Sequence, residues 1–350
     1  MLCLRQRPIP SVVGHMSRSY SLQRPYKFHV AAEWTGKPPH PENIPKPKVS
    51  FSANSPIVSW RDSSLSRLSS LHPPLSAGED FFLCTNMLHN SGVSLGIADG
   101  VGGWIDQGID SSMFSQALMY YAHGHFENGW AGEPEIDPTL EAPVEASPEG
   151  VEMTPSECLD LAYHDVLGDE SIEAGSSTAC LLTLNSATGV LRSVNLGDSG
   201  FCVIRSSSMF YNARPQTHGF NTPKQLAKLQ SARGRNFGSR GSLRDMPRVA
   251  ETWDTRVRDG DIVILYTDGL SDNVFPAEML KICSLTMSGP GSEMEQVQAI
   301  AGHLVQYARR CMFSSKLSPF ELDARRYKQR YQGGKVDDVT VVVALVRETQ

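Results

Sequence analysis

The sequence lacks the signals that define several large protein classes. Its seven cysteines are scattered, odd in number and without a Cys-x-x-Cys pair, which fits reduced thiols rather than a disulfide framework and gives no zinc-site spacing. No apolar run approaches the ~20 residues of a membrane span. The net charge of −6 gives no signal for nucleic acid or an anionic membrane. We therefore expect a soluble monomer with no membrane span and no nucleic-acid partner.

Charge of one sign is missing from two segments. Residues 1–32 contain no Asp or Glu but five Lys or Arg among serines, which is typical of a mitochondrial transit peptide; an ordinary basic tail is the alternative. Residues 124–150 contain seven acidic residues and no Lys or Arg, which predicts an acidic, mobile surface loop. The Pro- and Lys-rich residues 33–58 predict a linker without a catalytic part. The basic residues 212–248 predict a solvated loop, or a flap that steers a charged partner.

Aspartates stand at the ends of three apolar, strand-like runs, each beside glycine or a second aspartate. They are Asp99 after residues 93–98, Asp268 after residues 261–267, and Asp337-Asp338 before residues 339–346. A single Asp-Gly is most simply a hairpin turn. Three such ends indicate that carboxylates gather at one edge of the fold.

A gathering of carboxylates needs compensating charge. Two of them about 4 Å apart repel by roughly 4 kcal/mol at an effective dielectric constant near 20. Divalent cations remove that cost, and a ligand set made only of oxygens favours Mg²⁺ or Mn²⁺ over Zn²⁺. The sequence therefore predicts a Mg²⁺ or Mn²⁺ site that contains Asp99, Asp268 and Asp337.

Five short motifs follow one another in the order seen in metal-dependent protein phosphatases of type 2C, and the chain resembles that family over about residues 72–347. The motifs are Ala98-Asp-Gly-Val-Gly-Gly-Trp104, Ser177-Thr-Ala179, Asn195-Leu-Gly-Asp-Ser-Gly200, Asp268-Gly-Leu-Ser-Asp272 and Asp337-Asp-Val-Thr340. The form of the first motif, with Phe220-Asn-Thr-Pro-Lys-Gln-Leu226, resembles the mitochondrial branch. Each motif alone is weak, but their order is specific.

The resemblance implies an α+β fold: a four-layer α-β-β-α sandwich of two antiparallel sheets flanked by helices, spanning residues 59–350. It also implies two ions of Mn²⁺ or Mg²⁺ and a third, weaker one. The implied ligands are Asp99, the Gly100 carbonyl, Asp268, Asp337, Asp80 mostly through water, and Asp198 for the third ion. Glu79 is implied less firmly, and Asp338 is expected to orient its neighbours.

The implied activity is hydrolysis of phosphoserine and phosphothreonine on mitochondrial proteins, in the matrix, by a hydroxide that bridges the metals. Asp99, Asp268 and Asp337 carry it. No Cys-x₅-Arg run is present, so the sequence gives no sign of a thiol phosphatase. Two alternatives remain open: a pseudophosphatase that only binds phosphoproteins, and a hydrolase of small phosphate esters.

The chain departs from the family at two positions. Many members have an arginine that grips the substrate phosphate about five residues before Asp80, where this chain has Leu75 or Ser76. Many also have a histidine, proposed as general acid, after the first Asp-Gly, where this chain has Val101. Arg61 is a candidate for the missing grip.

Overall fold

Two five-stranded antiparallel sheets stack face to face in the computed structural model, which describes residues 25–38, 50–68, 75–132, 152–229, 234 and 243–349. In order, the first sheet contains β1 (Tyr26–Thr35), β14 (Val339–Glu348), β13 (Ile262–Tyr266), β7 (Gly200–Arg205) and β8 (Ser208–Asn212). The second contains β12 (Glu251–Arg256), β6 (Val190–Leu196), β5 (Ala179–Asn185), β3 (Gly92–Asp99) and β2 (Asp80–Asn86).

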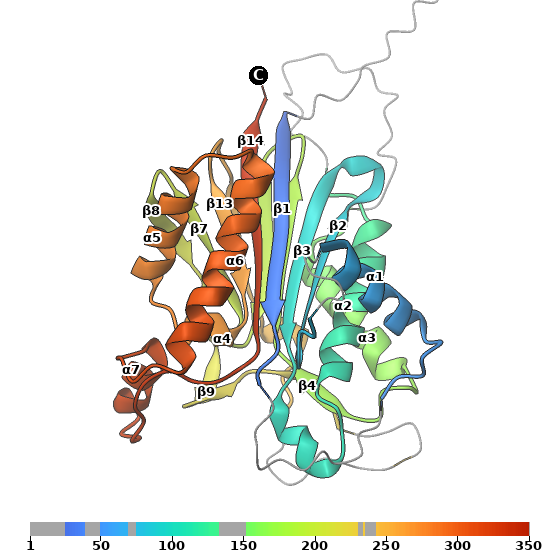
Figure 1. Ribbon diagram of the computed structural model, residues 1–350. Helices are drawn as coiled ribbons and strands as arrows, with labels where there is room; N and C mark the ends of the chain where they lie inside the picture. Colours follow the sequence, from blue (N-terminus) through green and yellow to red (C-terminus); the bar gives the residue numbers. More distant parts are fainter. Residues whose placement is uncertain are drawn as a thin grey trace, which may run out of the picture.

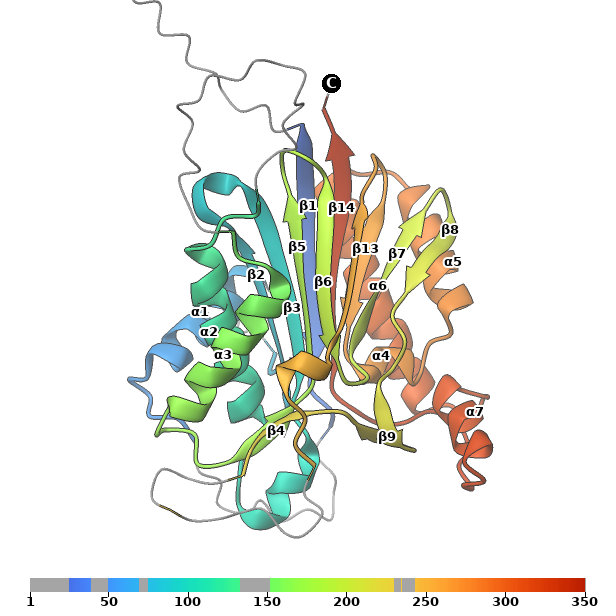
Figure 2. The same ribbon diagram turned by 180° about the vertical axis from the view of Figure 1, so that it is seen from behind.

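Helices cover the outer face of each sheet (Figures 1 and 2). Those on the first sheet are α5 (Pro276–Met287) and α6 (Glu293–Met312); those on the second are α1 (Pro56–Leu68), α2 (Ser112–Glu127) and α3 (Pro155–Gly168). The expected α+β sandwich with four layers is therefore confirmed. None of the helices in the described ranges is both long and apolar enough to cross a membrane.

The remaining elements are short. They are α4 (Asp268–Ser271), α7 (Pro319–Arg326), the paired β4 (Gly175–Ser177) and β11 (Leu226–Lys228), the paired β9 (Thr217–Gly219) and β10 (Thr222–Pro223), and 3-10 turns at Leu88–Asn90, Gly102–Gln107 and Pro247–Val249.

Strand β14 shows why the last apolar run is so long. Side chains of a strand alternate between the two faces, and here both faces are covered. Val342, Ala344 and Val346 pack in the core between the sheets. Val341, Val343 and Leu345 pack instead against α6, in a second core that also contains Leu304. Because residues 341–346 are covered on both faces, this part of β14 is continuously apolar.

The helices begin where their capping residues predict. The hydroxyl of Thr154 accepts the Glu157 amide and the Glu157 carboxylate accepts the Thr154 amide, which closes a capping box at the start of α3. Ser292 and Glu295 do the same for α6. These caps satisfy backbone N–H groups that the first helical turn leaves free.

The predicted N-terminal boundaries were wrong. Residues 26–35, divided in the sequence analysis between a leader ending at 32 and a linker starting at 33, form β1. This strand pairs along its whole length with β14, from Tyr26 opposite Glu348 to Thr35 opposite Val339. Ala31, Ala32 and Trp34 are buried, because β1 lies between α6 and the second sheet. The composition of this segment alone does not indicate that its apolar residues belong to the core.

Other expected segments need smaller corrections. Residues 56–58 of the predicted linker begin α1, and residues 124–127 of the predicted acidic loop complete α2. The rest of that loop, from residue 133 on, lies outside the described residues. Of the predicted basic loop 212–248, residues 230–233 and 235–242 also lie outside them, and its described part contains β9, β10 and β11.

Candidate active site

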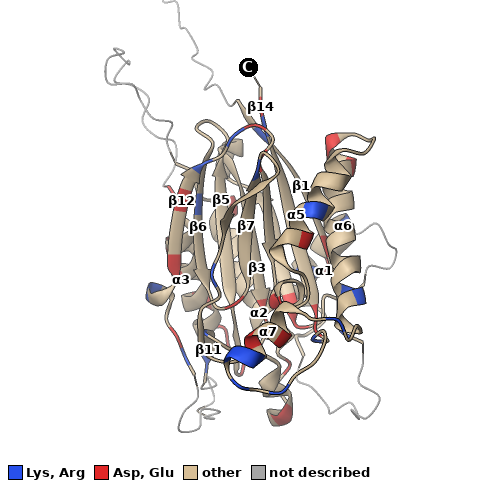
Figure 3. Ribbon diagram, turned by 90° about the vertical axis from the view of Figure 1, so that its left-hand side faces the viewer, with Lys and Arg blue, Asp and Glu red and all other residues tan. Residues whose placement is uncertain are grey.

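The acidic residues singled out in the sequence meet at one end of the two sheets. Asp80 opens β2 directly opposite Asp99, which closes β3. In the first sheet β13 ends next to the start of β14, where the Thr267 amide donates to the Thr340 carbonyl at 3.2 Å. Asp268 follows Thr267, and Asp337 precedes β14. In Figure 3 red ribbon, which marks Asp and Glu, gathers around α2 and α7 at this end.

The Ser-Thr-Ala motif holds the first aspartate in place. The Asp99 amide donates to the Thr178 hydroxyl oxygen at 3.1 Å, and the Thr178 amide donates to the Asp99 carbonyl at 3.0 Å. The hydroxyls of Thr178 and Ser199 lie 2.7 Å apart, which ties this strand end to the turn that carries Asp198. The backbone of Asp99 is therefore fixed independently of its carboxylate.

The carboxylates are close enough to change one another's ionisation. Burial, and then the charges of Asp268, Asp80, Asp337 and Asp198, raise the pKa of Asp99 well above its ordinary value. Burial also raises the pKa of Asp80, with further increases from Asp338 and Asp337. Mutual repulsion of this kind requires that the strand ends converge, as the sequence predicts.

A lysine that the sequence analysis missed lies among three of these carboxylates. Lys335 Nζ is 2.5 Å from Asp268 Oδ2, 2.8 Å from Asp272 Oδ2 and 3.1 Å from Asp337 Oδ2. Burial lowers the pKa of Lys335, but the carboxylates outweigh burial and raise it well above its ordinary value. Burial likewise raises the pKa of Asp268, yet Lys335 brings it below the ordinary value. The ammonium group acts here as a cation held by oxygen ligands.

A second lysine comes from the segment to which no catalytic part was assigned. Lys37, two residues after β1, places Nζ 2.6 Å from Glu79 Oε2 and 3.6 Å from both Asp337 Oδ1 and Asp338 Oδ2. Asp338 accepts the amides of Lys37 and Glu79 at 2.6 and 2.9 Å. Asp338 thus orients its neighbours, and the linker prediction was wrong at Lys37.

Four buried carboxylate oxygens at this end have no hydrogen-bond partner. They are Glu79 Oε1, Asp80 Oδ1, Asp198 Oδ1 and Asp268 Oδ1. Oxygens of this kind are costly unless a cation or a donor binds them. Within the described ranges no three acidic, histidine or cysteine side chains stand in a ready-made coordination geometry, which we attribute to the two ammonium groups lying among them. The donor set itself is all oxygen and fits Mg²⁺ or Mn²⁺.

The remaining predicted positions are placed as follows. Gly100 lies beside Glu79, whose carbonyl accepts the Gly100 amide at 3.1 Å. The Val101 amide donates to the Ser176 carbonyl at 3.0 Å. Arg61 lines a hollow of about 510 Å³ together with Leu75, Ser76 and Gly78, and its Nη1 donates to Gln116 Oε1 at 3.3 Å.

Of the missed residues, only Lys335 had a sequence signal. It stands between a pair of glycines and the Asp337-Asp338 pair, two residues from a predicted ligand. Lys37 had none, since it is one of several lysines in a proline-rich segment.

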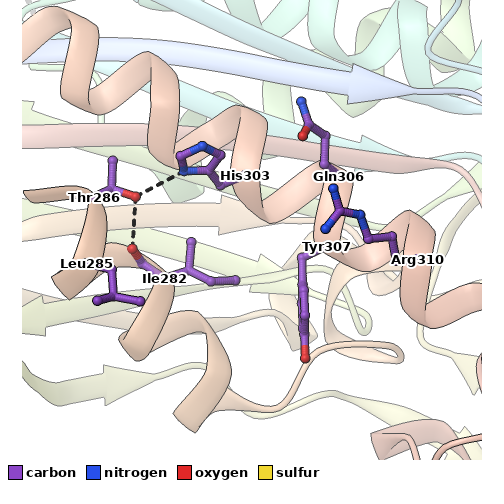
Figure 4. A pocket seen from close by; sticks show the side chains of 7 residues that line it. All are labelled: Ile282, Leu285, Thr286, His303, Gln306, Tyr307 and Arg310. Atoms are coloured by element: carbon purple, nitrogen blue, oxygen red, sulfur yellow. Dashed lines mark hydrogen bonds between the residues drawn. The ribbon is translucent and has the colours of Figure 1, made fainter. Parts of the chain in front are cut away.

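A separate hollow between α5 and α6 does not share this chemistry (Figure 4). It has a volume of about 350 Å³ and is lined by Ile282, Leu285, Thr286, His303, Gln306, Tyr307 and Arg310. No carboxylate lines it. Thr286 Oγ1 lies 3.1 Å from His303 Nδ1, and the Tyr307 hydroxyl donates to Glu278 Oε1 at 2.6 Å. The acidic end of the sheets is therefore the stronger candidate.

Comparison with known proteins decides the family. Protein phosphatase PTC7 homolog fig of Drosophila willistoni is 36% identical over 258 residues, which cover 73% of this chain and 74% of that protein. The chain belongs to the type 2C protein phosphatases, in the PTC7 group. Protein phosphatase PTC7 homolog of Xenopus laevis is 33% identical over 267 residues, 76% of this chain and 80% of that protein. No protein-family model matches the chain.

A solved structure of a distant relative supports the fold of this type 2C phosphatase. The X-ray structure of the photosystem II phosphatase PBCP superposes with a TM-score of 0.58 at 22% sequence identity, covering 91% of this chain and 98% of that one. Membership of the family makes the chain an enzyme of the protein serine/threonine phosphatase class, so the reading as a pure binding module is not favoured.

Proposed function

We propose that this type 2C phosphatase is a divalent-metal-dependent enzyme that removes phosphate from serine and threonine of mitochondrial proteins. The observation that carries the proposal is the set of four unpartnered, buried carboxylate oxygens beside a lysine ammonium group. A cluster that holds an ammonium ion through three carboxylates has the charge and the donor atoms to hold Mn²⁺ or Mg²⁺.

The residues that fit as ligands divide between the two sheets. Asp99 at the end of β3 and the Gly100 carbonyl after it would hold one ion, with Asp80 next to them, and Asp268 and Asp337 would hold the other from the first sheet. Asp198 and Asp268 are proposed to hold a third, weaker ion. When bound, the ions supply positive charge for the phosphoryl oxygens and lower the pKa of water.

The protein's own residues set the geometry of that site. Thr178 fixes the backbone of Asp99, and Thr267 Oγ1 donates to Asp80 Oδ2 at 2.8 Å, which leaves Asp80 Oδ1 free. Asp338 fixes the loop that carries Glu79. Arg61 remains the proposed grip for the substrate phosphate, and no replacement for the missing histidine is assigned.

Removal of metal is expected to abolish phosphate release from a phosphoserine peptide, and Mn²⁺ added in excess should restore it. A bound divalent ion would lower the pKa of water and offset charge on the phosphoryl oxygens, which carboxylates alone do not do. The measurement is phosphate release before EDTA, after EDTA and after add-back, with thermal unfolding of the same samples. Activity that is insensitive to EDTA would contradict the metal mechanism, and a melting temperature that is insensitive to Mn²⁺ would contradict the site.

Replacement of Lys335 by glutamine is expected to tighten Mn²⁺ binding about tenfold, because an entering cation no longer competes with an ammonium ion for Asp268, Asp272 and Asp337. The metal-free variant should melt at a lower temperature, since three carboxylates lose their counter-charge. Calorimetric titration and thermal unfolding measure both effects, with the exposed Lys316→Gln as control. Weaker Mn²⁺ binding by the Lys335 variant would show that the lysine positions the ligands instead of competing with the ion.

The cellular setting is proposed from the leader and the family branch. A transit peptide would lie before β1, within residues 1–24, which are outside the described range. Matrix localisation and a monomeric state belong to the same proposal. Fusion of residues 1–25 to a fluorescent protein tests it, because the fusion should enter mitochondria. A version with its arginines replaced should stay outside.

A further inference from the structure

A cleft of about 420 Å³ opens beside Asp198, between the start of β7 and the end of β8 on one side and helices α4, α5 and α7 on the other. Much of its lining is apolar and includes Val274, Phe275, Met279 and Leu322, while Arg326 contributes the positive charge. A volume of this size accommodates one or two amino-acid side chains. The carboxylate of Asp198 therefore lies at one wall of the cleft. The apolar lining suits an apolar side chain of a bound peptide, and Arg326 suits an acidic group next to it.

The last two residues of α7 and the turn that follows it form a basic segment, residues 325–332. Residues 325–332 contain four cations, Arg325, Arg326, Lys328 and Arg330, and no acidic residue, although the whole chain has a net charge of −6. All eight residues are exposed. Arg325 pairs with Glu321, and Arg326 lies 3.6 Å from Asp323. Lys328 and Arg330 extend the charge beyond the helix.

Helix α7 is fixed directly to the acidic site. The Phe320 amide donates to the Asp272 carbonyl at 3.0 Å, and the Phe320 ring centre lies 5.2 Å from Lys335 Nζ. Glu321 Oε2 accepts the Gly333 amide at 2.8 Å, which closes the turn back onto the segment that carries Lys335. Helix α7, whose Leu322 and Arg326 line the cleft, thus links the cleft and the basic residues that follow it to the segment that carries Lys335. Figure 1 shows α7 below α4, the short helix that begins at Asp268.

We propose that the cleft and the basic turn 325–332 form a docking site for the chain that flanks the phosphorylated residue, and that they select an apolar neighbour followed by acidic residues. The proposal rests on the proposed phosphatase function and names its substrate class. The apolar neighbour enters the cleft beside Asp198, and the acidic residues lie along Lys328 and Arg330. Complementary charge of this kind selects between partners and falls with ionic strength.

The test compares two phosphoserine peptides with one apolar neighbour, identical except that the outer flanks carry either Glu or Lys. The double variant Lys328→Gln/Arg330→Gln is compared with Arg258→Gln/Lys281→Gln, which removes as much charge elsewhere. Arg258 lies in the turn before β13, at the opposite end of that strand from Thr267. Hydrolysis of p-nitrophenyl phosphate, which has no flanking chain, reports the chemistry alone.

The expected result is that the wild-type protein has a lower KM for the Glu peptide, and that the Lys328/Arg330 variant raises this KM about fivefold. The Lys peptide and p-nitrophenyl phosphate should change less than twofold, as should every substrate with the control variant. An unchanged KM for the Glu peptide, or an equal loss on p-nitrophenyl phosphate, overturns the docking site.

Fluorescence anisotropy separates this proposal from the proposed function. A labelled Glu peptide is titrated with the protein, so that docking is read without turnover. If wild type hydrolyses no substrate yet binds the Glu peptide more tightly than the Lys328/Arg330 variant does, the phosphatase proposal fails and the docking site stands. Equal binding by wild type and this variant overturns the docking site whatever the activity.

Discussion

Asp99→Asn is expected to lower turnover of a phosphoserine peptide by roughly a thousandfold while the fold remains intact. Asparagine keeps the shape of the side chain but removes the charge that the proposed ion site needs most, at the junction of the two sheets. The backbone bonds between residue 99 and Thr178 do not depend on that charge. Steady-state kinetics with saturating Mn²⁺ measure the loss.

The same variant should be at least as stable as wild type when metal is absent. The folded-state pKa of Asp99 is raised by burial and by four other carboxylates, so its ionised form destabilises the fold above the pKa of the unfolded chain. The neutral amide removes that cost. The exposed Asp254 on β12 provides the control, since Asp254→Asn should change neither quantity. Near-normal turnover of Asp99→Asn would remove Asp99 from its role.

Gly269→Ala is expected to reduce the free energy of unfolding by about 3 kcal/mol or more, the upper end of what overpacking costs. A Cβ atom at residue 269 would lie 1.9 Å from the Asp338 carbonyl oxygen and 3.1 Å from Val339 Cγ2. The Asp338 carbonyl is backbone at the start of a strand buried on both faces, so it has little freedom to move. Any shift would also displace Asp268, the adjacent residue.

Urea unfolding at equilibrium measures this loss, and Gly302→Ala is the matched control. Gly302 lies within α6, and apart from its chain neighbours and the backbone of its own helix no atom lies within 4 Å of the place its Cβ would take. Alanine there should raise stability by roughly 0.5–1 kcal/mol through helix propensity alone. Equal stability of Gly269→Ala and wild type would show that the backbone at Gly269 and the backbone at Asp338 can move apart without loss of stability.

The convergence of the acidic residues was predictable because it follows from local rules. Asp99 and Asp268 follow apolar runs that stop at glycine, and Asp80 starts the run just before the Asp99 strand. Antiparallel neighbours place the start of one strand beside the end of the next. Pairing alone therefore brings Asp80 to Asp99, whereas Asp268 follows a strand of the other sheet and joins them through the stacking of the two sheets. The capping box at Thr154 was equally local.

The parts that sequence reasoning missed depend on contacts between distant segments. Strand β1 pairs with β14, more than 300 positions away, and no pattern within residues 26–35 indicates which strand will be its neighbour. Lys37 joins the acidic cluster only because that pairing carries it there. Lys335 lies close to a predicted ligand. Electrostatics alone does not predict a lysine among metal ligands, because its positive charge repels the ion.

The pairing of β1 with β14 also governs when the protein can fold during synthesis. In the first sheet β14 separates β1 from β13. Strand β1 therefore cannot join this sheet until β14, which ends at Glu348, has been synthesised. Until then β1 lacks the strand with which it pairs in this sheet. The first sheet therefore cannot be completed before β14 has been synthesised, and the catalytic end is assembled only when β1 and β14 pair.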